Sequence, residues 1–246
     1  MMEKDTFIFG IYPVLEALRN GKEMESLFIK RGSNGELFDE MLSLARKMEI
    51  PVHMVPIEKL KRMTQGNHQG VVGIASHIGY VPVEEIITTA FEEGRSPLLV
   101  LLDGITDVRN FGAIARSAEC AGADAIVFSS LNSAPVNAVA IKASAGALMH
   151  MPVCRVHNMV TTVKNMKNYG IKIIAASEKG RTVYTEYDFN EPTAIIMGAE
   201  DSGIDTALLK ISDYMVNIPM KGKVKSLNVS VASGVLLFEA LKQRMK

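Results

Sequence analysis

The sequence predicts an α/β protein in which a parallel sheet carries helices on both faces and a small α/β domain precedes it. Residues 98–102 form a continuous apolar run, which is typical of a strand buried on both faces. From there onward, short apolar segments alternate with amphipathic ones, and this order favours a parallel sheet. The 246 residues are enough for one large domain or two modest ones.

The first domain is expected over residues 1–78 and is built from short elements. An apolar stretch over 7–10 precedes Pro13, which suits the first turn of a helix over 14–19 that ends near Gly21. Apolar residues at helical spacing predict a second helix over 37–48. The other expected elements of this domain are strands over 26–29, 52–55 and 71–75, and a helix over 57–63.

Residues 79–96 are expected to be a linker, and residues 97–246 the second domain. Within the linker, Pro82 begins a short acidic helix and Gly94 ends it. The second domain's expected strands are 98–102, 125–128, 153–156, 171–175, 194–197 and 214–218, and its expected helices are 113–121, 136–142, 160–169 and 229–244.

Composition excludes some classes of partner. The 27 basic residues match the 27 acidic ones, and residues 1–80 carry ten of each sign, so any RNA-binding face must be local. No apolar run approaches the roughly 18 residues that span a bilayer, and residues 1–5 show no signal-peptide pattern. The two cysteines and five histidines lack metal-ligand spacing. We therefore expect a cytoplasmic protein without a membrane partner or a metal.

The common nucleotide-binding and hydrolase signatures are missing. No G-x-G-x-x-G follows a strand, and the chain contains no G-x-x-x-x-G-K-[ST] and no G-x-S-x-G. This disfavours a dinucleotide oxidoreductase, a P-loop enzyme and a serine hydrolase of the nucleophile-elbow type.

Three polar segments follow predicted strands, where open α/β sheets bind ligands. Residues 103–116 include Asn110 and Arg116, residues 197–203 bracket an acidic turn with two glycines, and residues 218–230 carry three lysines around a glycine. Each has a structural alternative. Asn110 suits a helix cap, the acidic turn suits the cap of a following helix, and Ser226 or Asn228 suits the cap of the last helix. Arg116 alone is equally compatible with a surface residue.

Taken together, the three segments resemble the motifs of the SpoU (TrmH-like) family of SPOUT RNA 2′-O-ribose methyltransferases. The matching runs are N-x-G-A-I-x-R over 110–116, M-G-x-E-x-x-G over 197–203, and I-P-M-x-G-x-x-x-S-L-N-V-S over 218–230. The third run is the most specific. Residues 9–18 and 67–71 are similar to the family's small RNA substrate-binding domain. The whole chain looks most like the subgroup that methylates a guanosine of 23S rRNA.

The resemblance implies a fold, a cofactor and a site. The fold is an α/β sheet with a C-terminal trefoil knot, and the family's members are homodimers. The implied cofactor is S-adenosyl-L-methionine, held by Met197, Gly198, Ile218, Met220, Ser226 and Leu227. The implied catalytic residues are Asn110, Arg116, Glu200, Ser226 and Asn228. No metal is implied.

The implied reaction moves a methyl group from a sulfonium to a ribose 2′-hydroxyl. A guanidinium pKa above roughly 12 makes Arg116 a poor base, so we expect it to bind RNA phosphate and stabilise the developing alkoxide. Three alternatives stay open: a tRNA ribose methyltransferase, a catalytically silent RNA-binding protein of the same fold, and an unrelated nucleotide-binding oxidoreductase. The family residues disfavour the silent protein, and the missing glycine fingerprint disfavours the oxidoreductase.

Overall fold

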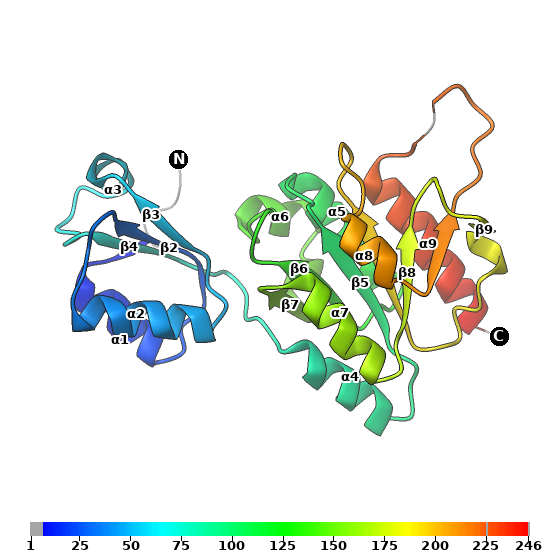
Figure 1. The fold of residues 1–246 in the computed structure, drawn as a ribbon, viewed down its shortest axis with the longest axis horizontal. Coiled ribbons are helices and arrows are strands. Elements are labelled where there is room, and N and C mark those ends of the chain that lie inside the picture. Colours follow the sequence, from blue (N-terminus) through cyan, green and yellow to red (C-terminus); the bar gives the residue numbers. More distant parts are fainter. Residues whose placement is uncertain (1–6, 225, 246) are drawn as a thin grey trace. The chain divides into compact units, whose positions relative to one another are not determined.

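The computed structural model describes residues 7–224 and 226–245. The chain forms two compact units that divide between Gly79 and Tyr80, and each unit has a sheet of its own (Figure 1). None of the helices among the described residues is both long and apolar enough to cross a membrane.

The first unit is a four-stranded mixed sheet with three helices. Its elements are β1 (Phe7–Phe9), α1 (Ile11–Arg19), β2 (Met24–Lys30), α2 (Glu36–Lys47), β3 (Val52–Val55), α3 (Ile57–Met63) and β4 (Val71–Ala75). The strand order is β1-β4-β2-β3, with β2 parallel to β3 and the other pairs antiparallel. Six of these elements were expected from the sequence, and the apolar stretch over 7–10 forms the seventh, β1.

The two faces of this sheet are covered unequally. Helices α1 and α2 pack on one face, where Leu15, Leu27 and Met41 are buried in the larger core cluster. The single helix α3 lies on the other face and forms a smaller cluster through Leu60 and Val72 (Figure 1). The second face is therefore only partly closed.

The second unit is a seven-stranded sheet whose strand pairs are all parallel. Its elements are α4 (Val83–Glu92), β5 (Leu98–Asp103), α5 (Val108–Cys120), β6 (Ala125–Ser129), α6 (Ala138–Ala143), η2 (Ala147–Met149), β7 (Val153–Val156), α7 (Met159–Asn168), β8 (Lys172–Ala176), β9 (Thr182–Val183), η3 (Tyr184–Glu186), β10 (Thr193–Gly198), α8 (Thr206–Ile211), β11 (Tyr214–Asn217) and α9 (Val229–Arg244). The strand order is β7-β6-β5-β10-β8-β11-β9. The predicted parallel sheet is confirmed.

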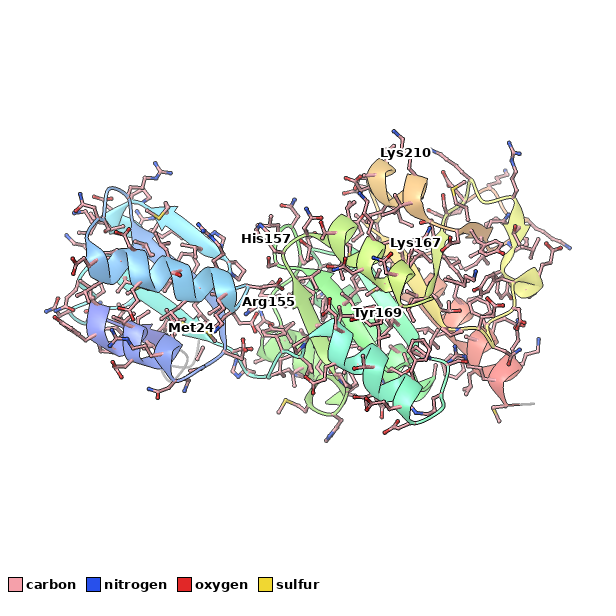
Figure 2. All side chains as sticks on the ribbon, turned by 60° about the horizontal axis from the view of Figure 1, so that its bottom comes forward. Met24, Arg155, His157, Lys167, Tyr169 and Lys210 are labelled. Carbon is pink, nitrogen blue, oxygen red and sulfur yellow. The ribbon has the colours of Figure 1, made fainter. Side chains whose placement is uncertain are left out.

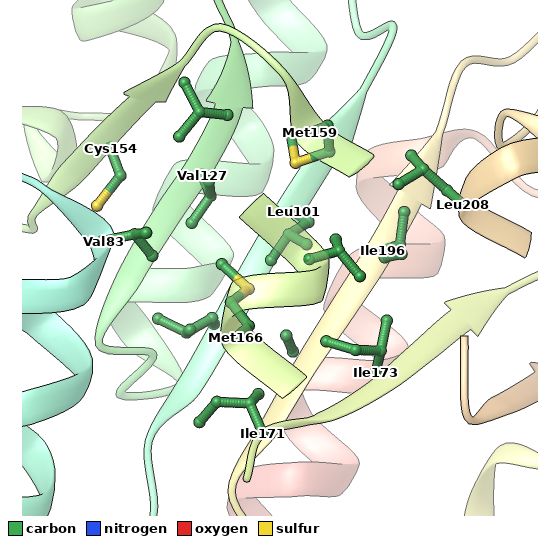
Figure 3. Close-up of a cluster of buried hydrophobic side chains, with 14 of the residues drawn as sticks. Val83, Leu101, Val127, Cys154, Met159, Met166, Ile171, Ile173, Ile196 and Leu208 are labelled. Atoms are coloured by element: carbon green, nitrogen blue, oxygen red, sulfur yellow. The ribbon is translucent and has the colours of Figure 1, made fainter. Parts of the chain in front are cut away.

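Helices cover both faces of this sheet, as expected. Helices α4, α7 and α8 lie on one face, and α5, α6 and α9 on the other (Figure 1). Figure 3 shows the apolar cluster under the first group, in which Met159 and Met166 of α7 meet Leu101 and Ile196 of the central strands. Lys167, labelled in Figure 2, also ties α7 to the start of β11, because its Nζ lies 2.8 Å from the Asp213 carboxylate.

Two sequence-based expectations differ from the structure. The segment expected as a linker contains α4, and this helix belongs to the second unit because Val83 and Ile87 are buried in its core. Helix α5 begins at Val108 instead of residue 113. Asp107 caps it by accepting a hydrogen bond from the Arg109 backbone N–H at 2.7 Å.

Candidate active site

The polar segments singled out in the sequence converge because the strands before them run in parallel. In the register of β5 and β10, Asp103 lies opposite Gly198, so the first two segments leave the sheet side by side. Strands β8 and β11 continue the same parallel set. Their carboxyl ends share one edge, the usual ligand-binding edge of such sheets.

A cavity of about 570 Å³ opens at this edge. All six residues expected to hold a cofactor line it, namely Met197, Gly198, Ile218, Met220, Ser226 and Leu227. Its volume lies within the range of roughly 300–1,000 Å³ typical of small-molecule sites. Apolar side chains and glycine backbone make up much of the wall, and this suits an aromatic base held by main-chain groups.

Gly198 is required by a close crossing of the chain within this wall. A Cβ atom at this position would lie 2.7 Å from the Gly203 carbonyl oxygen and would overlap the Ile204 nitrogen. The loop between them folds back on itself, and the Gly203 N–H donates to the Ala199 carbonyl at 2.9 Å. Glu200 therefore sits in a tight turn at the cavity rim.

A hydrogen-bonded group of three side chains joins the motifs. The Asn228 amide donates to Glu200 Oε1 at 2.5 Å and to Asn110 Oδ1 at 3.0 Å. The Asn110 amide in turn donates to Glu200 Oε1 at 3.3 Å. All three side chains lie at least partly exposed, so the group can meet a substrate at the mouth of the cavity.

The helices that carry this group are fixed by their own local contacts. Asn228 caps α9, since its Oδ1 accepts the Ser230 backbone N–H at 3.0 Å, as the sequence allowed. Asn110 is not a cap, which corrects that alternative, because Asp107 holds this position. Gly112 serves packing, since a Cβ atom there would lie 2.6 Å from the Ala140 carbonyl oxygen of α6.

The structure does not bring Arg116 to the cavity of its own chain. Arg116 is exposed on α5, and it is absent from the residues lining the cavity. Six helical residues after Asn110, it lies roughly 9 Å along the axis and on another side of the helix. Ser226 lines the cavity and is exposed.

Sequence reasoning missed a fourth segment of the cavity. Ala176, Ser177, Glu178 and Lys179 lie at and after the end of β8 and line the cavity beside the motif loops. The Ser177 N–H donates to the Val216 carbonyl at 2.9 Å, which binds this turn to β11. The sequence did indicate that this turn lies at the ligand-binding edge, because it follows a predicted strand of the parallel sheet. Its residues match no motif, however, so nothing marked them as part of the site.

Asp103 supports the site from beneath. Its carboxylate accepts the Asp205 backbone N–H at 2.7 Å and so ties the end of β5 to the end of the Glu200 loop. Burial raises the pKa of Asp103 above its ordinary value, although this hydrogen bond partly opposes the shift. The described residues contain no cluster of His, Cys, Asp or Glu that could hold a metal ion.

Comparison with known sequences identifies relatives of both units. A model of the SpoU rRNA Methylase family matches residues 97–238, and a model described as RNA 2′-O ribose methyltransferase substrate binding matches residues 7–81. The protein YacO of Bacillus subtilis (strain 168), whose name places it among TrmH family tRNA/rRNA methyltransferases, is 32% identical over 244 residues. This match covers 99% of the present chain and 98% of YacO.

Solved structures show the same fold. The SpoU methyltransferase AviRb from Streptomyces viridochromogenes, crystallised with AdoMet, matches with a TM-score of 0.63 at 24% identity and covers 97% of this chain and 90% of its own. An AdoMet-bound rRNA methyltransferase from Sinorhizobium meliloti matches with a TM-score of 0.61 at 25% identity, over 96% of this chain and 87% of its own.

Proposed function

The chain belongs to the SpoU rRNA Methylase family, and from this premise we propose that it transfers a methyl group from S-adenosyl-L-methionine to a ribose 2′-hydroxyl of RNA. The observation that carries the proposal is the group formed by Asn110, Glu200 and Asn228 at the rim of a nucleoside-sized cavity.

The cofactor would lie in the cavity between the Gly198 loop and the segment from Ile218 to Leu227. Backbone groups at Gly198, Ile218 and Leu227 would hold its adenosine part, with Met197, Met220 and Ser226 beside them. The tight turn at Gly198 supports this role, because only glycine allows the backbone of this cavity wall to pack so closely. When bound, the cofactor supplies an electrophilic methyl group on a sulfonium.

The three-residue group at the rim would hold the ribose. Glu200 and the two asparagine amides offer hydrogen-bond acceptors and donors that match a sugar hydroxyl. Alignment of the hydroxyl oxygen with the methyl group can supply on the order of 7–11 kcal/mol of the barrier in well-oriented systems. Arg116 would bind the RNA phosphate and stabilise the alkoxide as the hydroxyl proton passes to that phosphate or to water.

Since Arg116 lies outside the cavity of its own chain, we include a homodimer in the proposal. Helix α9 exposes Val231 and Phe238, which are 51% and 50% accessible and lie about two turns apart on the same helix. This helix packs against α5, which carries Arg116. A partner that covers this apolar stripe would stand beside Arg116, and it could present its own cavity to that guanidinium.

We further propose 23S rRNA as the substrate, with a guanosine as the methylated nucleotide, and a trefoil knot in the C-terminal fold. The motifs of residues 9–18 and 67–71 support the first point. The SpoU family match over residues 97–238 supports the second. We also propose residues 1–78 as an RNA substrate-binding domain and residues 97–246, with α4 packed on their core, as the methyltransferase domain. The cytoplasmic location stays a prediction.

The test is methyl transfer from tritiated S-adenosyl-L-methionine to RNA taken from a strain that lacks this gene. We expect incorporation into 23S rRNA, resistance of the product linkage to alkali, and loss of both with Glu200→Gln. Incorporation into tRNA would show that the substrate is a tRNA, a class that the name of the relative YacO also includes. Cofactor and RNA binding without any methyl transfer would favour the catalytically silent alternative.

A further inference from the structure

The half-open face of the first unit's sheet carries a row of rings. Phe9 pairs with Val72, Val72 with Phe28, and Phe28 with His53, so the four residues form one line across all four strands. They point to the same face, since directly paired residues share a side of the sheet. Among the described residues, α3 is the helix that packs on this face.

The rings at the two ends of this row are exposed, Phe28 is half-buried, and Val72 between Phe9 and Phe28 is buried. The His53 ring stacks on Phe28 with 4.9 Å between centroids and 24° between planes. His53 is exposed, and Phe9 is 37% accessible. Phe9 packs closely against Gly66, where a Cβ atom would overlap its ring, so this loop covers part of the ring and fixes its position. Partial burial and the Lys59 charge lower the pKa of His53 and so favour its neutral ring.

Positive charge surrounds the same face. Lys59 Nζ lies over the Phe28 ring, 5.0 Å from its centroid. Residues 30–31 and 57–63 carry five bases and one acid, namely Lys30, Arg31, Lys59, Lys61 and Arg62 against Glu58. The helices on the opposite face, α1 and α2, carry three bases and four acids, and Arg19 is bound to two of these acids.

We propose that the row of Phe9, Phe28 and His53 is a stacking surface for unpaired bases of the RNA substrate, with Lys59 and its basic neighbours on the phosphates. Aromatic side chains on an open sheet are a general means of binding single-stranded RNA, because every base has a flat face. The excess of positive charge on this side selects a polyanion over an apolar protein partner. This inference rests on the proposed function, which supplies RNA as the ligand. It adds the surface that binds the RNA and the single-stranded state in which the RNA is bound.

The experiment measures binding of a short, unstructured, fluorescein-labelled RNA to the full-length protein by anisotropy at several salt concentrations. The decisive variant is His53→Ala, which removes an exposed ring and leaves the core intact. The matched control is Met54→Ala, because Met54 is the next residue of β3, is 43% accessible and faces the other side of the sheet. His53→Tyr tests whether another ring restores binding.

We expect His53→Ala to weaken binding by about 5-fold to 100-fold, the usual effect of losing one stacked base, with no change in salt dependence. His53→Tyr should bind nearly as wild type. Lys59→Gln should lower the slope of log K against log salt by roughly 0.7, the value for one phosphate contact on a single strand. The same sequence as a duplex should bind more weakly.

The proposal is overturned if His53→Ala binds like Met54→Ala, if the duplex binds as well as the single strand, or if the wild type does not bind the RNA. These results are independent of catalysis. A wild type that binds through His53 but transfers no methyl group would refute the proposed function alone. Methyl transfer that persists while His53→Ala leaves RNA binding unchanged would refute the stacking surface alone.

Discussion

Asn228 Nδ2 donates to Asn110 Oδ1 at 3.0 Å and so joins two residues that are 118 positions apart in the chain. The same amide donates to Glu200, and the side-chain carbonyl oxygen of Asn228 caps α9 through the Ser230 N–H. One side chain thus begins the last helix and also fixes the rim group. These two roles can be separated by substitution.

Asn228→Ser should separate the cap from the rim contacts. Serine caps helices about as well as asparagine, so the free energy of unfolding should change by only a few tenths of a kcal/mol. Its short hydroxyl cannot reach Asn110 and Glu200 together, so methyl transfer should fall by about 100-fold, the scale of a misplaced reacting group. Denaturant unfolding and initial rates measure the two effects.

Asn137→Ser is the matched control for this variant. Asn137 caps α6 by accepting the Val139 and Ala140 N–H groups, and it does not line the cavity. The Asn137→Ser substitution should leave both the free energy of unfolding and the rate of methyl transfer near their wild-type values. Wild-type turnover in Asn228→Ser would show that the rim contacts do not position the substrate.

Much of the fold could be predicted because its strands are buried on both faces. Residues 98–102 and 194–197 are buried throughout, and their continuous apolar runs reflect this directly. The apolar runs also indicated a parallel sheet, and the motif residues that follow its strands could therefore be placed at one edge. Strand order could not be predicted, because β10 inserts between β5 and β8, and this depends on tertiary packing.

The parts of the site that sequence reasoning missed depend on contacts across the chain. The turn over 176–179 lines the cavity through its position after β8, and its residue types carry no distinctive chemistry. The role of Gly112 depends on the neighbouring helix α6. Arg116 matches the motif, but the helical rotation between it and Asn110 takes it away from the cavity. This was missed from the sequence, because the helix was expected to begin at residue 113, which left Asn110 outside it.

Gly112→Ala should destabilise the protein although alanine favours helices. The added Cβ would lie 2.6 Å from both the Ala140 carbonyl oxygen and the Ala143 Cβ, so α5 and α6 would have to separate. Overpacking of this kind costs about 1–3 kcal/mol, more than the helix propensity returns. Urea unfolding of the purified variant measures the change.

Gly234→Ala is the paired control, since Gly234 also lies within a helix. Its added Cβ would lie 3.8 Å from Ser117 Oγ, which is an ordinary contact. We therefore expect stabilisation of about 0.4–1 kcal/mol. Equal effects of the two substitutions would contradict the packing role of Gly112.

Asp103→Asn should raise stability at neutral pH. The pKa of Asp103 is raised in the folded protein by burial, so ionisation of this group opposes folding above that pKa. As the pH falls through the raised pKa, the native carboxyl takes up a proton and the penalty disappears. The stability gap between the Asp103→Asn variant and wild type should therefore narrow in acid, as followed by unfolding midpoints from neutral to acidic pH. A gap that widens in acid would contradict a raised pKa.

Arg116→Lys should abolish most turnover and leave cofactor binding unchanged. The guanidinium lies outside the cavity, so its replacement should not alter the dissociation constant of S-adenosyl-L-methionine, measured by calorimetry. Lysine keeps the charge but loses the two-pronged geometry, so methyl transfer should fall by about 100-fold to 1,000-fold, as when one donor to a developing oxyanion is removed. Mixing Arg116→Ala with Glu200→Gln subunits should restore part of the activity, because a mixed dimer can combine an intact Arg116 with an intact cavity. Failure of the mixture to recover any activity, with mixed dimers demonstrated by mass, would place Arg116 and the cavity of the same chain in one site and contradict the shared arrangement.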